Sequence, residues 1–207
     1  SHRRRDGRGA PETGRWFLMA VLDPPLMLFI AGLGVGLVMA SIARSRDGEE
    51  GTQMTLNAGL AFIGVGLMSS GWTYAIHNSL LTSGESSMCA SEGLVQCGSV
   101  IGDPNWNNLF GVPWGITGLI SFSLLFFLFL SLRMDMHAKW SETFTNLSWY
   151  AGLAGLPFVA FLVFVELTQV DGAPHICPFC TVAHLSLIGF LVTAYLLRGR
   201  RESSNWT

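Results

Sequence analysis

The chain has 207 residues, of which 50% are hydrophobic and only 13% are charged, and its formal net charge is −2. Water-soluble domains carry about 25% charged residues, so the composition excludes a soluble globular domain and indicates an integral protein of a lipid bilayer. We expect no nucleic acid partner. The four cysteines are too few for a disulfide-rich scaffold, and their number is typical of a redox protein.

The first part of the chain combines a basic tail with a hydrophobic stretch. Residues 1–15 are polar and rich in arginine, and we expect a disordered tail there. The hydrophobic stretch that follows is interrupted at Pro24-Pro25 and resumes over residues 26–43. This second part is long enough to cross about 30 Å of hydrocarbon. Residues 16–55 are therefore predicted to hold one transmembrane helix and the loop after it.

Further apolar segments follow, each long enough to span a bilayer. They cover residues 56–78, 113–132, 147–168 and 178–197. Each is predicted to be a helix, because an open sheet leaves backbone groups unpaired in lipid. The expected fold class is an all-α integral membrane protein, in which a four-helix transmembrane bundle forms the core and one extra transmembrane helix precedes it.

Basic residues predict which side of the membrane each loop faces. Lys and Arg occur in the connections 44–55 and 133–146 and in the tail after the last span, whereas the loops 79–112 and 169–177 contain none. The positive-inside rule therefore places the first group in the cytoplasm and the two loops without Lys or Arg outside. All four cysteines lie in or beside these outer loops.

The arginine-rich tail departs from this rule if all the apolar segments span the membrane, because the tail then lies outside. We expect it to be translocated in spite of its charges. The alternative is that the break at Pro24-Pro25 makes the first segment interfacial and leaves four spans.

Two pairs of cysteines lie on the predicted outer side. Cys177 and Cys180 form a Cys-Pro-Phe-Cys motif at the start of the last span, where unpaired N–H groups and the helix dipole favour a thiolate. Cys89 and Cys97 lie in a long polar loop, with seven residues between them. Thiols outside the cytoplasm are not kept reduced, so the arrangement is typical of a relay. One loop cysteine would exchange with a soluble partner and the other with Cys177.

The last span also carries residues that suit the reduction of a lipid-soluble oxidant. Cys180 lies one turn deeper than Cys177, and His184 follows four residues later on the same helix face. Reduction of a quinone takes two electrons and two protons, so His184 is predicted to donate a hydrogen bond to a quinone oxygen. The alternative is that His184 only packs against a neighbouring helix. Glu166 is able to relay protons, but we expect its side chain to be solvated at the membrane interface.

Other kinds of protein also use four cysteines. A zinc site favours short spacing in both pairs, which Cys89 and Cys97 lack, and no metal site is predicted. Covalent haem attachment needs His directly after the Cys-x-x-Cys motif, where Thr181 stands. A non-catalytic membrane protein with two structural disulfides is the main alternative. Against it, a Cys-x-x-Cys motif at a helix start is strained and easily reduced.

Three motifs follow one another along the chain: Cys89 and Cys97 followed by Gly-Ser-Val, then Asn-Asn-Leu-Phe-Gly-Val-Pro at residues 107–113, then Cys-Pro-Phe-Cys at residues 177–180. Together they resemble the vitamin K epoxide reductase family, above all its bacterial members, which perform oxidative protein folding outside the cytoplasm. The resemblance implies a four-helix catalytic domain over residues 56–198, around a quinone pocket near the outer surface, and a cytoplasmic tail over residues 199–207.

The same resemblance implies a role for each cysteine. By motif position, Cys180 is the thiol that attacks the quinone, and Cys177 is its partner, which exchanges with Cys97. Cys89 is the cysteine that meets the external partner. A short half-helix is expected to begin near Cys97.

The resemblance also implies residues that bind the quinone. Asn107, in the Asn-x-x-Phe-Gly pattern, matches the family asparagine that donates a hydrogen bond to a quinone oxygen, and Phe110 belongs to the same pattern. His184 stands where the animal enzymes carry a tyrosine that binds the same ligand, so a hydrogen-bond donor is kept although the residue differs.

The function implied is that of a quinone-dependent thiol-disulfide oxidoreductase, a multi-pass enzyme of the cell membrane with its active site on the extracytoplasmic side. The quinone is expected to be menaquinone or ubiquinone. Many bacterial relatives carry a fused thioredoxin-like domain that is missing from this sequence, so the electron donor is expected to be a separate DsbA-like thioredoxin-fold protein. Reduction of a quinone epoxide is an alternative, because it uses the same cysteines and the same pocket.

Overall fold

The computed structural model describes residues 23–84, 94–204 and 206. The tail predicted at residues 1–15 lies outside this part of the chain. The described elements are α2 (Pro24–Arg44), α3 (Gly48–Ser83), α4 (Gly98–Ile101), β1 (Asn108–Leu109), β2 (Val112–Pro113), α5 (Trp114–Met134), α6 (Ser141–Thr168) and α7 (Pro178–Glu202).

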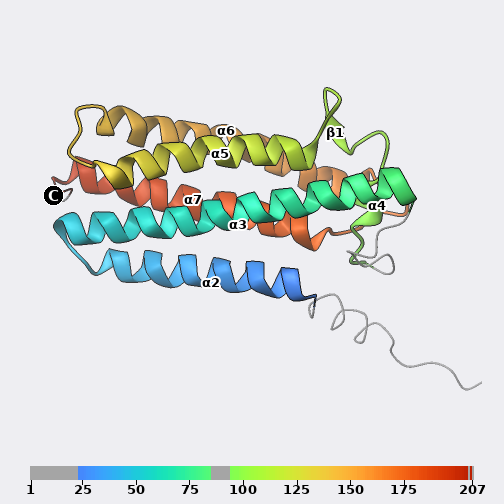
Figure 1. Ribbon diagram of the computed structural model, residues 1–207, viewed down its shortest axis with the longest axis horizontal. Helices are drawn as coiled ribbons and strands as arrows, with labels where there is room; N and C mark the ends of the chain where they lie inside the picture. The colour runs from blue at the N-terminus through green and yellow to red at the C-terminus, as the bar shows by residue number, and fades with distance from the viewer. Residues whose placement is uncertain (1–22, 85–93, 205, 207) are drawn as a thin grey trace, which may run out of the picture.

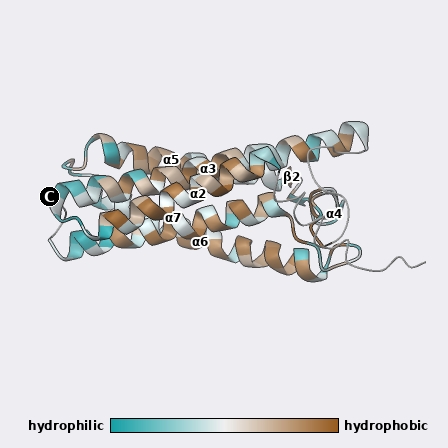
Figure 2. Ribbon diagram, turned by 90° about the horizontal axis from the view of Figure 1, so that it is seen from below, coloured by the Kyte–Doolittle hydropathy of each residue, from teal (hydrophilic) through white to brown (hydrophobic). Residues whose placement is uncertain are grey.

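The long helices α2, α3, α5, α6 and α7 run alongside one another in an elongated bundle (Figure 1). α3 packs against α2, α5 and α7, and α6 packs against α5 and α7. Within the described residues, these five helices are long and apolar enough to cross a membrane. Hydrophobic residues dominate the middle of the bundle (Figure 2). The all-α membrane fold expected from the sequence is therefore confirmed.

α3 is longer at both ends than the span predicted for it. It has 36 residues and begins at Gly48, inside the segment predicted to be a charged loop. Glu49 and Glu50 in its first turn suit the positive end of the helix dipole. The hydroxyl of Thr52 donates a hydrogen bond to the backbone carbonyl of Trp206 (2.9 Å). A contact with the far end of the chain thus stabilises helical turns that lie beyond the apolar segment.

Phe62 of α3 fills the space between α2 and α7. A Cβ atom at Gly36 of α2 would lie 2.8 Å from this ring, and one at Gly189 of α7 would lie 2.5 Å from it. Carbon atoms do not approach so closely without displacement, so the packing of these three helices requires glycine at both positions.

Replacement of Gly189 by leucine is expected to destabilise the protein. The new side chain would overlap the Phe62 ring, and overpacking of a core costs about 1–3 kcal/mol or more. The matched control is Gly199→Leu on the same helix, where a Cβ meets nothing within 4 Å. We expect Tm in detergent to fall by about 5–10 °C for Gly189→Leu alone. Equal Tm values for the two variants would contradict the packing described here.

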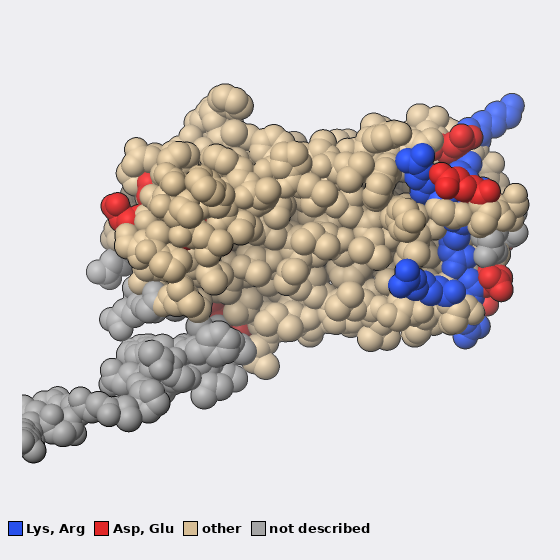
Figure 3. All heavy atoms as spheres, turned by 180° about the vertical axis from the view of Figure 1, so that it is seen from behind, with Lys and Arg blue, Asp and Glu red and all other residues tan. Residues whose placement is uncertain are grey.

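Lysine and arginine side chains of the described residues gather at one end of the bundle (Figure 3). They are Arg44, Arg46, Arg133, Lys139, Arg198, Arg200 and Arg201. Arg200 connects α7 to the end of α2, because its guanidinium donates hydrogen bonds to the backbone carbonyls of Ala43 and Arg46. The opposite end of the bundle carries α4, the β1–β2 hairpin and the start of α7 (Figure 1). The cysteine motif and the described cations therefore lie at opposite ends.

Candidate active site

The Cys-Pro-Phe-Cys motif forms the first turn of α7. Cys177 is the N-cap residue in an extended conformation, and Pro178 occupies the first helical position, where its missing N–H has no intrahelical partner to lose. The backbone N–H of Cys180 donates to Sγ of Cys177 (3.4 Å). Cys177 and Cys180 are free thiols, and Cys177 is buried. The helix start thus holds the two sulfur atoms one turn apart, as the sequence predicts.

Side chains from two other helices hold Phe179, the residue between the two thiols. Its ring packs edge-to-face on Phe29 of α2, with 6.1 Å between centroids, and lies 6.2 Å from the ring of Trp72 of α3. The hydroxyl of Ser69 donates to the backbone carbonyl of Phe179 (2.6 Å). The conformation of the motif therefore depends on α2 and α3 as well as on α7.

The segment that carries Cys97 pairs with the loop before Cys177. Val95 and Ile176 form a parallel β-bridge. The N–H of Ile176 donates to the carbonyl of Leu94 (2.9 Å), and the carbonyl of Ile176 accepts from the next residue of that segment, Gln96 (3.2 Å). This pairing joins the segment before Cys97 to the loop before Cys177, and both cysteines are fully buried.

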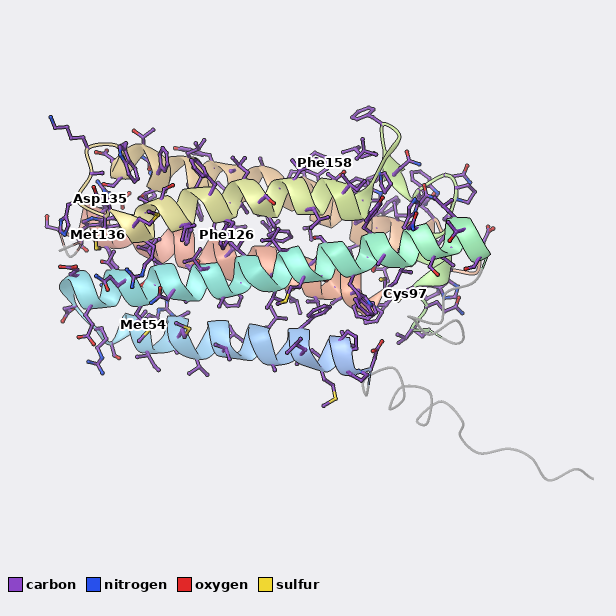
Figure 4. All side chains as sticks on the ribbon, in the orientation of Figure 1. Met54, Cys97, Phe126, Asp135, Met136 and Phe158 are labelled. Carbon is purple, nitrogen blue, oxygen red and sulfur yellow. The ribbon has the colours of Figure 1, made fainter. Side chains whose placement is uncertain are left out.

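Cys97 itself precedes α4, the short helix that the family resemblance implies at this place. Cys97 is disulfide-bonded and fully buried, and Figure 4 places it at the end of the bundle opposite to Asp135 and Met136. Cys89 lies outside the described residues.

The β1–β2 hairpin and two tryptophans form the outer wall of the site. Asn108 pairs with Pro113 across the hairpin, so that Asn107 and Trp114 flank it. The indole N–H of Trp114 donates to the carbonyl of Trp106 (2.8 Å), and the backbone N–H of Trp114 donates to the carbonyl of Asn107 (3.4 Å). These bonds fix the position of Asn107 beside two aromatic side chains.

A cavity lies between this wall and the first turn of α7. Its volume is about 30 Å³, and its lining includes Cys180 and residues from α3, α5 and α6. The lining is mainly apolar, with Trp106 and Trp114 among its side chains, and its polar members are Thr73, His77, Asn107 and Glu166. Cys180 therefore faces a small, mostly hydrophobic space that contains a few hydrogen-bonding groups.

The structure brings only some of the predicted site residues to this cavity. Asn107 and Cys180 line it. His184 is buried one turn further along α7, and it is not among the lining residues. Phe110 lies at the tip of the hairpin with a positive φ of 51° and is 98% exposed. His184 and Phe110 do not line this cavity, so their roles in quinone binding remain predictions.

Several lining residues were not predicted from the sequence to belong to the site. Glu166 was expected at the wet interface, but only 4% of it is exposed. A carboxyl group within an apolar span is the signal that could have identified it. Trp106 and Trp114 resemble the aromatic side chains that commonly anchor helices at the membrane surface, and His77 lies in a span without a neighbouring motif. Sequence alone does not separate these residues from structural ones.

Residues 56–195 match the model of the vitamin K epoxide reductase family, which is more than half of the chain. The chain belongs to the vitamin K epoxide reductase family. Searches of curated proteins and of solved structures found no match. Membership of the family makes this protein a membrane oxidoreductase of the vitamin K epoxide reductase type.

α2 lies outside the part of the chain that matches the vitamin K epoxide reductase family. Its contact with the site, through Phe29 and Phe179, is nevertheless direct. This helix therefore packs against the first turn of α7, and the contact lies outside the residues that match the family.

Enzymes of the vitamin K epoxide reductase family use quinones in general, and the chemistry of the cavity suits such a group. Trp106 and Trp114 offer apolar surfaces for a ring, Asn107 offers an amide, and Oε1 of Glu166 has no hydrogen-bond partner among the described residues. A space of about 30 Å³ holds about two water molecules. A quinone ring is larger, so its entry requires the lining side chains to move apart.

Proposed function

We propose that this member of the vitamin K epoxide reductase family is a quinone-dependent thiol-disulfide oxidoreductase. Electrons would pass from a separate DsbA-like thioredoxin-fold protein to Cys89 and Cys97, then to Cys177 and Cys180, and then to a membrane quinone, menaquinone or ubiquinone. The observation that carries this proposal is the position of the Cys-Pro-Phe-Cys motif. Cys180 lines the cavity, while the loop before Cys177 is bonded to the segment before Cys97.

The cysteine steps are thiol-disulfide exchanges. A thiolate of the reduced donor attacks the disulfide between Cys89 and Cys97, and the donor leaves with a disulfide of its own. Cys97 then attacks Sγ of Cys177 in the oxidised motif, and Cys180 leaves as the thiolate. Cys89 attacks the mixed disulfide, which restores the loop disulfide and leaves Cys177 reduced. The β-bridge between Val95 and Ile176 supports exchange between the two pairs, because it joins the segment that leads to Cys97 to the segment that leads to Cys177.

The residues around the cavity would bind and orient the quinone. Oδ1 of Asn107 accepts a hydrogen bond from Asn108 (2.7 Å), so its amide nitrogen is left to donate to a quinone oxygen. Trp106 and Trp114 would hold the ring and exclude water. A bound quinone accepts two electrons and two protons as the motif becomes a disulfide. Cys180 would contribute the thiolate that faces the ring.

The charge distribution supports an extracytoplasmic active site in the cell membrane. The described cations lie at the end of the bundle opposite to the cysteines (Figure 3), and cytoplasmic segments carry an excess of Lys and Arg. A donor on the outer side would meet the loop pair directly, and disulfide formation would follow outside the cytoplasm, where thiols are not kept reduced.

The test is quinone reduction by the purified protein in detergent, with a reduced DsbA-like protein as electron donor. We expect turnover with menaquinone or ubiquinone, followed by quinone absorbance, and one disulfide formed in the donor for each quinone reduced. Turnover with a quinone epoxide alone would favour the epoxide reductase alternative. No turnover with either acceptor would contradict the proposal.

Replacement of Asn107 by alanine is expected to weaken quinone binding. The variant loses one hydrogen bond, worth about 1 kcal/mol, so KM for quinone should rise about fivefold to tenfold. The matched control is Asn105→Ala, an exposed asparagine of the same loop, which should leave KM unchanged. An unchanged KM for Asn107→Ala would remove this residue from the proposed quinone site.

A further inference from the structure

Glu166 is a buried carboxyl group next to the Cys-Pro-Phe-Cys motif. It lies near the end of α6 and is 4% exposed. Its backbone carbonyl accepts the N–H of His175 (3.0 Å), which holds the loop before Cys177 against the end of α6. Its side chain lines the same cavity as Cys180. The geometry thus places a carboxyl group and a reactive thiol in the lining of one cavity, where the quinone is proposed to bind.

The surroundings of this carboxyl group do not stabilise it fully. Its polar neighbours include the backbone of Cys177 and the thiol of Cys180. Its Oε1 atom, however, has no hydrogen-bond partner among the described residues. An unpaired buried acceptor destabilises the folded protein, above all when it is charged. No lysine or arginine of the described residues lines the cavity, so an ion pair does not explain why a carboxyl group stands here.

Other ionisable groups around Glu166 are less well placed for a proton transfer. His77 of α3 also lines the cavity, but its Nδ1 atom lies 3.3 Å from the carbonyl of Ile101. His175 contributes its backbone N–H to Glu166. From α7, the ionisable group that lines the same cavity is the Cys180 thiol. Among the lining residues, Glu166 is therefore the carboxyl group that shares the cavity with a reactive thiol.

We propose that Glu166 transfers protons between the Cys177/Cys180 thiols and the quinone, an inference that rests on the function proposed above. Oxidation of the two thiols forms one S–S bond and releases two electrons and two protons. Reduction of a quinone to a hydroquinone consumes two of each. The Glu166 carboxylate accepts the proton of Cys180, delivers it to the acceptor oxygen in the cavity, and repeats the transfer for the proton of Cys177. It ends as the carboxylate with which it began.

The test compares Glu166→Gln, Glu166→Asp and the control Glu142→Gln, an exposed glutamate in the first turn of the same helix. Two steps are measured on each protein. The first is reduction of Cys177/Cys180 by dithiothreitol without quinone, followed by thiol alkylation. The second is quinone reduction by the dithiol form, measured over a range of pH and in H₂O and D₂O.

General acid-base catalysis contributes about 10²–10⁴-fold to rates. We therefore expect Glu166→Gln to slow quinone reduction about 100-fold, to change its pH profile and solvent isotope effect, and to leave the dithiothreitol step within about twofold of wild type. Glu166→Asp should recover part of the rate, and Glu142→Gln should match wild type in both steps.

Other outcomes would overturn the proposal in different ways. A rate of quinone reduction close to wild type in Glu166→Gln would remove Glu166 from proton transfer, although the proposed function would stand. Equal slowing of both steps, with an unchanged pH profile, would show a structural role only. A wild-type protein that reduces no quinone would contradict the proposed function itself.

Discussion

Replacement of Cys180 by serine is expected to lower quinone reduction at least about a thousandfold, which is the scale found when a catalytic nucleophile is removed. Cys180 lines the cavity, and serine at this position cannot supply a thiolate or form the disulfide with Cys177. The rate is measured by quinone absorbance with dithiothreitol as donor. The matched control is Thr181→Ser, which retains the hydroxyl that donates to the Cys177 carbonyl (3.0 Å).

The same variant should also change the products of thiol exchange. Without Cys180, Cys177 can form a disulfide with Cys97 only by attacking Sγ of Cys97 in the loop disulfide, which releases Cys89 as the thiolate. No second motif thiol can then displace Cys97, and only the return attack of Cys89 resolves the Cys97–Cys177 disulfide, so we expect a detectable population of it. Mass spectrometry of the alkylated protein would detect it. Turnover of Cys180→Ser at the wild-type rate would show that the roles of the two motif cysteines are assigned wrongly.

Replacement of Ile176 by proline is expected to slow thiol-disulfide exchange between the two cysteine pairs. Proline removes the N–H that donates to the Leu94 carbonyl (2.9 Å). Leu94 is exposed and Ile176 is half-buried, so loss of this hydrogen bond costs about 1–1.5 kcal/mol. The arrangement that joins the two segments should therefore become about fivefold to tenfold less populated. Turnover with a DsbA-like donor should fall by that factor.

Dithiothreitol distinguishes this effect from general damage, because it reduces Cys177 and Cys180 without the loop pair. Its turnover should stay within about 1.5-fold of wild type in Ile176→Pro. The control Ile176→Val keeps the backbone N–H and should behave like wild type with both donors. Equal losses with the two donors would instead indicate a disturbed helix start, and no loss with the protein donor would show that exchange does not depend on this pairing.

The order and class of the helices were predictable from the sequence because lipid imposes a simple rule. A chain that crosses hydrocarbon must pair its own backbone groups and needs about 20 apolar residues to do so. The ends of the helices were less predictable. α3 begins at Gly48 rather than near residue 56. The bond between Thr52 and Trp206 stabilises its first turns, and a local sequence pattern does not predict a contact between residues so far apart. The domain boundaries at residues 15, 55 and 198 stay predictions.

The candidate site was predictable only in part. Cys177 and Cys180 are recognisable because their spacing and the helix start are local properties, and Asn107 belongs to a motif. The burial of Glu166 and the contact between Phe29 and Phe179 depend on how α2, α6 and α7 pack. The sequence does not indicate a role for the extra N-terminal helix, and the structure shows that its Phe29 packs against Phe179 of the cysteine motif.

The sequence by itself determined that this is a membrane protein with apolar helices, a Cys-x-x-Cys motif at a helix start and the motifs of the vitamin K epoxide reductase family. These properties follow from composition and from spacings within a few turns of the chain. Only the tertiary structure decided that the Cys97 segment pairs with the loop before Cys177, and that Cys180, Asn107 and Glu166 share one cavity. These residues are far apart in sequence, and their proximity results from helix packing that no local pattern encodes.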